Sequence, residues 1–365
     1  MTTKVLLIAL AGLAERDLSR LVLPMDSAKA SLQPISPATV CPTLTSLVTG
    51  VYPERHGVVS DAPCSVGIVS PLPHRLKSAT RAKTIFSLAH AAGLKTVAVN
   101  WPLTEGDLDI DFLLSDCNDD SDAVAKVAAI LTDAAPDFAA LQLRGVLDAK
   151  LQYGADSPEA AAALETMQAQ LAVLLPLAEN VLLVGAVSPQ AITQKVSLNA
   201  EFVRRDLISL DENGCFADYK AWCQSNGLSS FVYLKNPSNM GVHDQTEDLL
   251  DALQKNGSFG IGEVLTREDA ALKHHLYGSF SFVVCSDGET AFDNEVTASA
   301  KNLAEKASCG AVGGGEGFLL AAGPAFLSAH TAEKTIPDVA ATCASLLGLK
   351  LPLAKGRPIA EILKS

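Results

Sequence analysis

The sequence predicts an α/β fold in which helices cover both faces of a mostly parallel sheet. Short continuous runs of aliphatic and β-branched residues alternate with longer stretches of helical periodicity, which is typical of such a sheet. The expected strands are residues 5–10, 96–100, 138–143, 181–184, 230–234, 281–285 and 317–321. The expected helices include residues 43–49, 84–92, 122–134 and 158–177. In this architecture the ligand crevice lies beyond the carboxyl ends of the strands.

The stretch from about residue 196 to residue 305 differs in character from the rest. It is more polar, contains the step His274-His275 and includes loops such as residues 235–239. We therefore predict an α/β core formed by residues 1–195 and 306–365, with residues 196–305 inserted as a cap-like subdomain.

Composition and charge exclude several classes of partner. The chain has 365 residues, of which 48% are hydrophobic and 19% are charged, as in a folded globular protein. A formal net charge of −13 offers no electrostatic footprint for a nucleic-acid backbone, so no nucleic acid is expected as a partner. No uninterrupted apolar run approaches the roughly 18 residues of a membrane span, so no membrane is expected either.

The N-terminus and the cysteines together predict a cytoplasmic location. The run from Met1 to Leu18 could imitate a signal peptide. The favoured interpretation is a buried first strand followed by a turn at Gly12, because cleavage would delete the strand that heads the fold. Eight cysteines without C-x-x-C spacing are typical of free, buried thiols in a reducing compartment.

Residues 37–61 carry the most informative motif. Cys41-Pro42 precedes the run L-V-T-G-V-Y-P-E-R-H-G at residues 47–57. This segment resembles the nucleophile segment of type I phosphodiesterases and nucleotide pyrophosphatases, a branch of the alkaline phosphatase superfamily. The resemblance covers nearly the whole chain. It implies an alkaline phosphatase-like three-layer sandwich with an inserted subdomain.

The resemblance also implies where catalytic groups should stand. Relatives hold two metal ions, usually zinc, between Asp and His ligands, and these ions activate a Thr or Ser nucleophile. In this chain the nucleophile position is Val40. Surrounding motifs, such as residues 156–159 and 323–326, fix the register of the other positions. The six family ligand positions are Ala11, Leu147, Leu151, Ala186, Val187 and Val312.

All seven of these residues are apolar. Aliphatic side chains offer a cation no donor atom. A buried cluster of charges without its metal would also carry a large desolvation cost, which a full set of aliphatic replacements removes. The sequence therefore predicts a dry pocket, no metal cofactor and loss of the two-metal chemistry.

Other reactive groups near the motif are weak candidates. Thr39 neighbours the nucleophile position, but the intact Cys41-Pro42 step argues against a shifted register, and a turn or helix-cap role is favoured. Cys41 lies near a helix start, which can lower a thiol pKa, although active relatives carry Cys there without using it. The helix start at Thr43, Thr45 and Ser46 offers free backbone N–H groups, so it could bind a phosphate without hydrolysing it.

Three functions remain. The first is a catalytically degenerate family member that acts as a binding or regulatory protein or as a partner subunit. The alternative is an active metal-dependent hydrolase of phosphodiester, phosphonate or nucleotide pyrophosphate bonds, and hydrolysis at a new metal-free site is a third possibility. The expected partner is a small molecule or a protein. A homo-oligomer is compatible with the sequence, which identifies no ligand.

Overall fold

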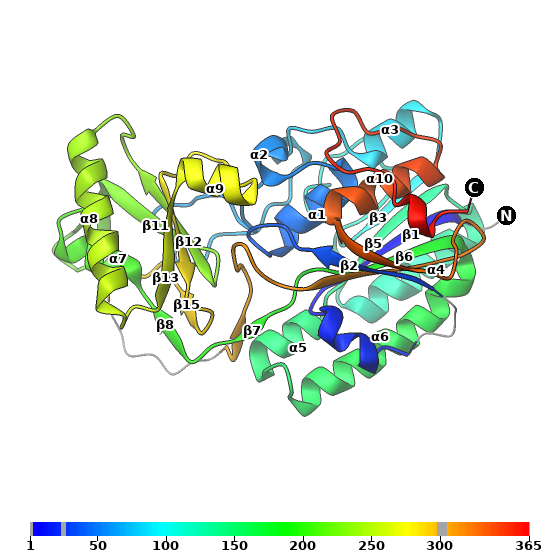
Figure 1. Cartoon of the computed structure of the whole chain (residues 1–365), viewed down its shortest axis with the longest axis horizontal. Coiled ribbons are helices and arrows are strands. Elements are labelled where there is room, and N and C mark those ends of the chain that lie inside the picture. The colour runs from blue at the N-terminus through cyan, green and yellow to red at the C-terminus, as the bar shows by residue number, and fades with distance from the viewer. Residues whose placement is uncertain (1–2, 23–26, 298–304, 365) are drawn as a thin grey trace.

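The computed structural model describes residues 3–22, 27–297 and 305–364. An eight-stranded sheet forms the larger part of the molecule, which we call the core (Figure 1). In spatial order its strands are β18 (His330–Thr335), β2 (Ala28–Gln33), β17 (Gly317–Ala322), β6 (Ala178–Gly185), β1 (Thr3–Leu10), β5 (Phe138–Leu143), β3 (Thr96–Val99) and β4 (Phe112–Leu114). β17 runs antiparallel to both of its neighbours, and the other pairs are parallel. The sheet is therefore mostly parallel, as the sequence predicted.

Helices cover both faces of this sheet, so the core has three layers (Figure 1). One face carries α1 (Val40–Thr49), α3 (Ile85–Ala91) and α10 (Ile336–Leu346), and the other carries α4 (Asp120–Ala134), α5 (Gly145–Tyr153) and α6 (Pro158–Leu174). Successive side chains of a strand point to opposite faces. In β1, Val5 and Leu7 accordingly pack in the cluster with α1 and α10, whereas Leu6 and Ile8 pack with α4 and α6.

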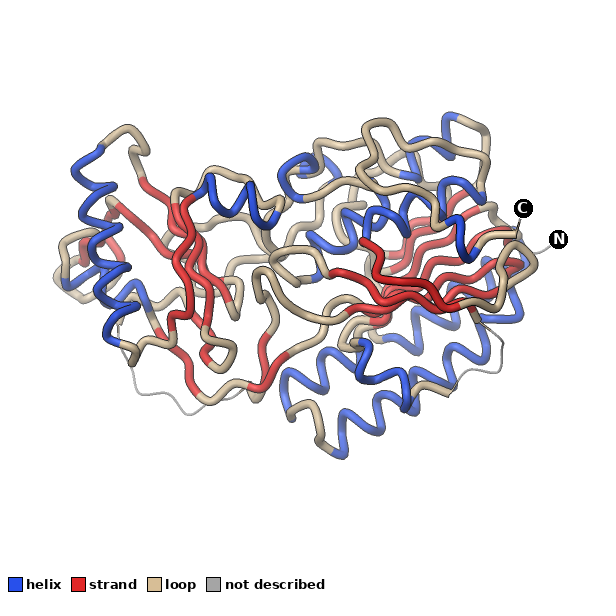
Figure 2. The backbone as a smooth tube through the Cα atoms, viewed as in Figure 1, coloured by secondary structure: helices blue, strands red, loops and turns tan. Residues whose placement is uncertain are grey.

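A smaller antiparallel sheet forms the second part of the molecule, which we call the cap (Figure 2). Its strands are β11 (Ala221–Ser225), β12 (Ser229–Leu234), β14 (Phe282–Ser286) and β13 (Ile261–Thr266). α7 (Leu198–Arg204) and α8 (Met240–Asn256) lie on its outer side, and α9 (Arg267–His274) lies toward the core (Figure 1). Residues 298–304 of the predicted insertion lie outside the described residues.

Short elements complete the chain. Between the two sheets, β7 (Gln190–Ala191) pairs with β16 (Ala307–Ser308), and β8 (Gln194–Val196) pairs with β15 (Thr290–Phe292). The remaining ones are β9 (Ile208–Leu210), β10 (Phe216–Tyr219), α2 (Pro53–His56) and the 3-10 turns η1 (Glu15–Arg20), η2 (Lys77–Ala79), η3 (Leu175–Leu177) and η4 (Ala360–Ile362).

The apolar helix α6 and the cysteines qualify two expectations. α6 with η3 is long and apolar enough to cross a membrane by length and composition, but it packs Leu164, Met167 and Leu171 into the core, and core helices pass the same test. All eight cysteines are free thiols. Cys64 and Cys215 are exposed, however, so the expectation that the cysteines are buried is wrong for these two.

Candidate functional site

The carboxyl ends of β5, β1 and β6 meet at one edge of the sheet, because the three strands are adjacent and parallel. The N–H of Ala11 donates a hydrogen bond of 2.9 Å to the carbonyl of Leu143, and the N–H of Gly12 donates one of 2.7 Å to the carbonyl of Val187. These bonds join the three strand ends into one surface. Helix α1 packs its first turns against that surface, where a ligand crevice is expected.

Hydrocarbon occupies most positions at which relatives are expected to hold catalytic groups. Five of the seven positions belong to one buried cluster and are at most 9% exposed: Ala11, Val40, Leu147, Ala186 and Val187. Leu151 packs against the edge of the same cluster. The predicted set therefore comes together, with one exception.

Val312 is the exception. Its side chain packs against the apolar cluster of the cap that includes Leu276 and Phe280, and not with the other six. The backbone explains this placement: Ala38 and the loop before β17 exchange two hydrogen bonds, from Ala38 N to Ala311 O (2.9 Å) and from Gly310 N to Ala38 O (3.1 Å). The main chain of that loop is thus held beside the start of α1, while Val312 contributes to the cap.

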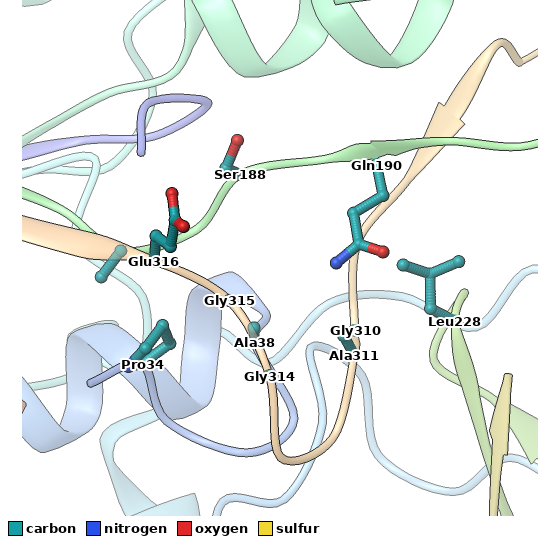
Figure 3. Close-up of a pocket in the computed structure, with 11 residues that line it drawn as sticks. Pro34, Ala38, Ser188, Gln190, Leu228, Gly310, Ala311, Gly314, Gly315 and Glu316 are labelled. Carbon is teal, nitrogen blue, oxygen red and sulfur yellow. The ribbon is translucent and has the colours of Figure 1, made fainter. Parts of the chain in front are cut away.

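Two small voids remain in this region. One, of about 10 Å³, lies between α1 and the strand ends, and Thr43 is the polar side chain on its wall. The other, of about 20 Å³, is bounded by Ala186 and by the loop before β17 (Figure 3). Figure 3 shows the Gln190 amide extending toward it and Leu228 approaching from the cap, while the Ser188 hydroxyl points away. A void needs roughly 10–15 Å³ to hold one water molecule, so each space is about the size of a single water.

The residues at the expected ligand positions do not fit a metal ion. Zinc in proteins is held by Cys, His, Asp or Glu, and none of Ala, Val or Leu supplies a lone pair. In the part of the chain that the structure describes, the group of His, Asp and Glu side chains close enough to share an ion is His243, Asp244 and Glu247. That group lies on α8 of the cap, away from the strand ends.

The start of α1 is occupied by a carboxylate of the same chain. The N–H of Cys41 donates a hydrogen bond of 2.7 Å to Asp61 Oδ1. Desolvation raises the pKa of Asp61, and the hydrogen bond from Cys41 works in the opposite direction. No sequence motif singled out Asp61. The signal available was an acidic residue four positions after the Y-P-x-x-H-G turn, and a loop of that length does not specify where its side chains fold back.

Hydroxyl groups near this helix start are mostly engaged elsewhere. Thr45 Oγ1 donates to the carbonyl of Cys41 (2.7 Å), and Ser46 Oγ lies 3.0 Å from His56 Nε2. Thr43 Oγ1 is buried and has no hydrogen-bond partner. Of the three predicted anion-binding residues, Thr43 alone therefore keeps a free hydroxyl, and whether an anion binds here stays a prediction.

Both nucleophile candidates lie beside the carboxyl group of Asp61. Thr39 stands at the N-cap position of α1, yet its hydroxyl makes no capping hydrogen bond. Burial raises the pKa of the Cys41 thiol well above its usual value, and the Asp61 carboxylate raises it further. A thiol with a raised pKa is a poor nucleophile, since the thiolate is the reactive form.

His56 has a structural role. Its side chain is fully buried, and Nδ1 accepts a hydrogen bond of 3.1 Å from the N–H of Val58. Nδ1 is therefore unprotonated, and Nε2–H is left to donate to Ser46 Oγ. Burial lowers the pKa of His56 to about 3, which keeps this imidazole neutral.

The charged side chains of Asp148 and Lys150 on α5 have partners of opposite charge. Asp148, one position away from an expected ligand, forms an ion pair of 2.7 Å with Arg144. Lys150 is buried, and its ammonium donates to the carbonyl of Gly12 (2.8 Å) and to the carboxylate of Asp17 (3.0 Å). Desolvation lowers the pKa of Lys150, against the attraction of Asp17. This pair joins η1 to α5, and no pattern in the sequence predicted it.

The three-layer core, the mostly parallel sheet and the α1 segment at its carboxyl edge define an alkaline phosphatase-like fold. Within that class, the family model described as type I phosphodiesterase / nucleotide pyrophosphatase matches residues 9–286. The chain belongs to this family.

Solved structures agree with the fold. Murine ectonucleotide pyrophosphatase / phosphodiesterase 5 (ENPP5) superimposes with a TM-score of 0.76 at 16% identity and covers 99% of this chain and 100% of its own. Human ENPP5 gives 0.75 at 17% identity, with full coverage of both chains. An inactive variant of the murine protein in complex with AMP gives 0.73 at 16% identity and covers 97% of each chain. No curated protein sequence matches this chain.

Proposed function

We propose that this chain is a catalytically degenerate member of the family, which uses the fold for binding or regulation instead of hydrolysis. One observation carries the proposal: five of the seven expected catalytic positions form part of one continuous hydrocarbon cluster. Two-metal catalysis needs donor atoms that fix the cations and a hydroxyl that they activate. Apolar side chains supply neither.

The contact between Asp61 and Cys41 supports the same proposal. Helix N-termini bind anions through free N–H groups, and in this chain a carboxylate already takes that place. A substrate phosphate would compete with the Asp61 side chain for the N–H group of Cys41 at the helix start. The chain's own acidic side chain therefore opposes the substrate binding mode that the fold otherwise favours.

The proposal includes the absence of a metal cofactor at the strand ends, a cytoplasmic location, and a small molecule or protein as partner. AMP is the first small molecule to examine, because an inactive variant of murine ENPP5 has been solved with it. That structure concerns another protein, and here it supports only the choice of probe.

The test is a joint measurement of metal content and turnover. We expect the full chain, purified after expression with added zinc, to contain well below one equivalent of zinc by mass spectrometry. We also expect it to leave bis-(p-nitrophenyl) phosphate intact. Stoichiometric zinc together with turnover that a chelator abolishes would establish the alternative, an active metal-dependent hydrolase. Turnover that survives the chelator would indicate a metal-free site instead.

A further inference from the structure

A larger polar cleft lies where the cap meets the core. Its volume is about 290 Å³, near the lower end for small-molecule sites. The end of β2, residues 313–315 and Glu333 line it from the core, and the C-terminal end of α9 lines it from the cap. None of the seven expected catalytic positions lines this cleft, so it is a separate space.

Backbone donors are available on one wall. The N–H of Gly313 donates to Ser36 Oγ (3.0 Å), whereas the N–H groups of Gly314 and Gly315 donate no hydrogen bond to the described residues. Gly313 and Gly315 have positive φ angles of 72° and 114°, and Gly314 between them does not. Consecutive N–H groups in such an alternating conformation form a concave site for anions.

Side-chain donors approach the same wall from α9. The ring of His274 packs directly on Gly313, because a Cβ atom at Gly313 would lie 2.4 Å from His274 Cε1. Lys273, the preceding residue, is exposed and adds an ammonium group to the cleft. His275 stacks on Tyr52 with 4.4 Å between the ring centroids, which anchors this end of α9 to the core.

Three carboxylates lie around the cleft, and they differ in their partners. Glu263 pairs with Lys273 at 3.2 Å, and Glu54 lies 3.6 Å from His275 Nδ1. Glu333 forms no hydrogen bond or ion pair with the described residues. A free carboxylate in a ligand cleft is a good acceptor for hydroxyl groups, as in the recognition of a ribose.

From these groups we infer that the cleft binds a small phosphomonoester that carries hydroxyl groups, of the sugar-phosphate class. The phosphate contacts the N–H groups of Gly314 and Gly315 and the ammonium of Lys273, and the hydroxyls contact Glu333. Because the cleft is separate from the start of α1, this inference goes beyond the proposed loss of hydrolysis. Zinc content and turnover bear on the proposed function, and ligand binding at the cleft bears on the inference, so either can fail without the other.

The test is calorimetric titration of the full chain with ribose 5-phosphate and, separately, with inorganic phosphate. A Gly314→Asp variant places a carboxylate in the cleft, and its Cβ meets no atom within 4 Å. We expect this variant to lower the affinity for both ligands by about tenfold or more. Lys273→Gln should lower both affinities by about fivefold. Gly241→Asp and Lys255→Gln make the same changes on α8, and we expect them to have no effect.

Glu333→Gln separates the two parts of the ligand. It should lower the affinity for ribose 5-phosphate several-fold, because a carboxylate acceptor is lost. The affinity for inorganic phosphate should stay unchanged or increase, because a negative charge is lost from the cleft. No heat of binding for wild-type protein at about 10 mM ligand would overturn the inference. Affinities that the Gly314 and Lys273 variants leave unchanged would also overturn it.

Discussion

Asp61 Oδ1 accepts a hydrogen bond of 2.7 Å from the N–H of Cys41, so α1 begins on a carboxylate from a loop twenty residues further along the chain. A helix N-terminus attracts negative charge because its first N–H groups lack intrahelical partners. The carboxylate therefore stabilises the helix in the place where a substrate anion would otherwise bind.

Replacing Asp61 should both destabilise the fold and open the helix start. We expect Asp61→Ala to lower the free energy of unfolding by about 1–2 kcal/mol, the usual cost of losing a helix cap. In this variant, added phosphate or sulfate should raise the melting temperature more than in the wild type, since an anion can then take the carboxylate's place.

Asp119→Ala is the matched control for that experiment. Asp119 caps α4 by accepting a hydrogen bond of 2.8 Å from the N–H of Asp122. Its loss should lower the free energy of unfolding by a similar amount. Added phosphate or sulfate should raise the melting temperature of this variant no more than that of the wild type. An equal response to anions in the two variants would show that the start of α1 is not a latent anion site.

The buried imidazole of His56 makes stability depend on pH. Its folded-state pKa of about 3 lies below the ordinary value of 6.5. Between these values the unfolded chain binds a proton that the folded chain does not, so the free energy of unfolding falls as pH decreases from about 6.5 toward 3. The fall from this residue is about 1.4 kcal/mol per pH unit.

Urea unfolding at a series of pH values checks this expectation. His56→Asn should be less stable at pH 7, because the contact with Ser46 is lost, but its stability should fall less steeply below pH 6.5. Burial also lowers the pKa of His74 and His274, so the difference between the variant and the wild type isolates His56. His90→Asn, at an exposed position, should keep the wild-type slope.

The buried pair of Lys150 and Asp17 should be costly to break from one side. Lys150→Met leaves the Asp17 carboxylate buried without its partner, and we expect a loss of about 3–5 kcal/mol in the free energy of unfolding. Adding Asp17→Asn should recover a substantial part of the loss, because it removes the unpaired charge. Chemical denaturation of both variants provides the measurement, and a double variant no more stable than Lys150→Met would contradict this account.

Restoring a single carboxylate to the hydrocarbon cluster should be unfavourable. Ala186 is 6% exposed, and Ala186→Asp would bury a charge among Ala11, Val40 and Val187. We expect a loss of more than about 3 kcal/mol, or no folded protein. Ala162→Asp on the exposed face of α6 should cost about 1 kcal/mol or less. Thermal unfolding of the two variants compares them, and equal losses would mean that the cluster tolerates charge.

Much of the core could be predicted from the sequence, because buried strands are continuous apolar runs. β1, β5 and β17 lie where these runs predicted them. β2 and β18 were missed. Both contain lysine and lie at one edge of the sheet. β2 alternates buried with more exposed residues and β18 has a single buried residue, so neither gives a continuous apolar run.

The candidate site was only partly predictable. Motif register placed six of the seven positions in or against one cluster, because residues at the ends of adjacent parallel strands must meet. Val312 departed from the set, since side-chain direction in a loop depends on backbone contacts that spacing does not encode. Asp61, the pair Lys150–Asp17 and the cleft all depend on contacts between segments far apart in the sequence, which single-segment patterns do not contain.

Pro34, Gly314 and Gly315 line both the cleft and the 20 Å³ void beside Ala186, so these residues form a partition between the two spaces. A ligand that displaces these residues from the side of the cleft would change the volume of the smaller void. A spectroscopic label in the smaller space would therefore respond to ligand binding in the larger one.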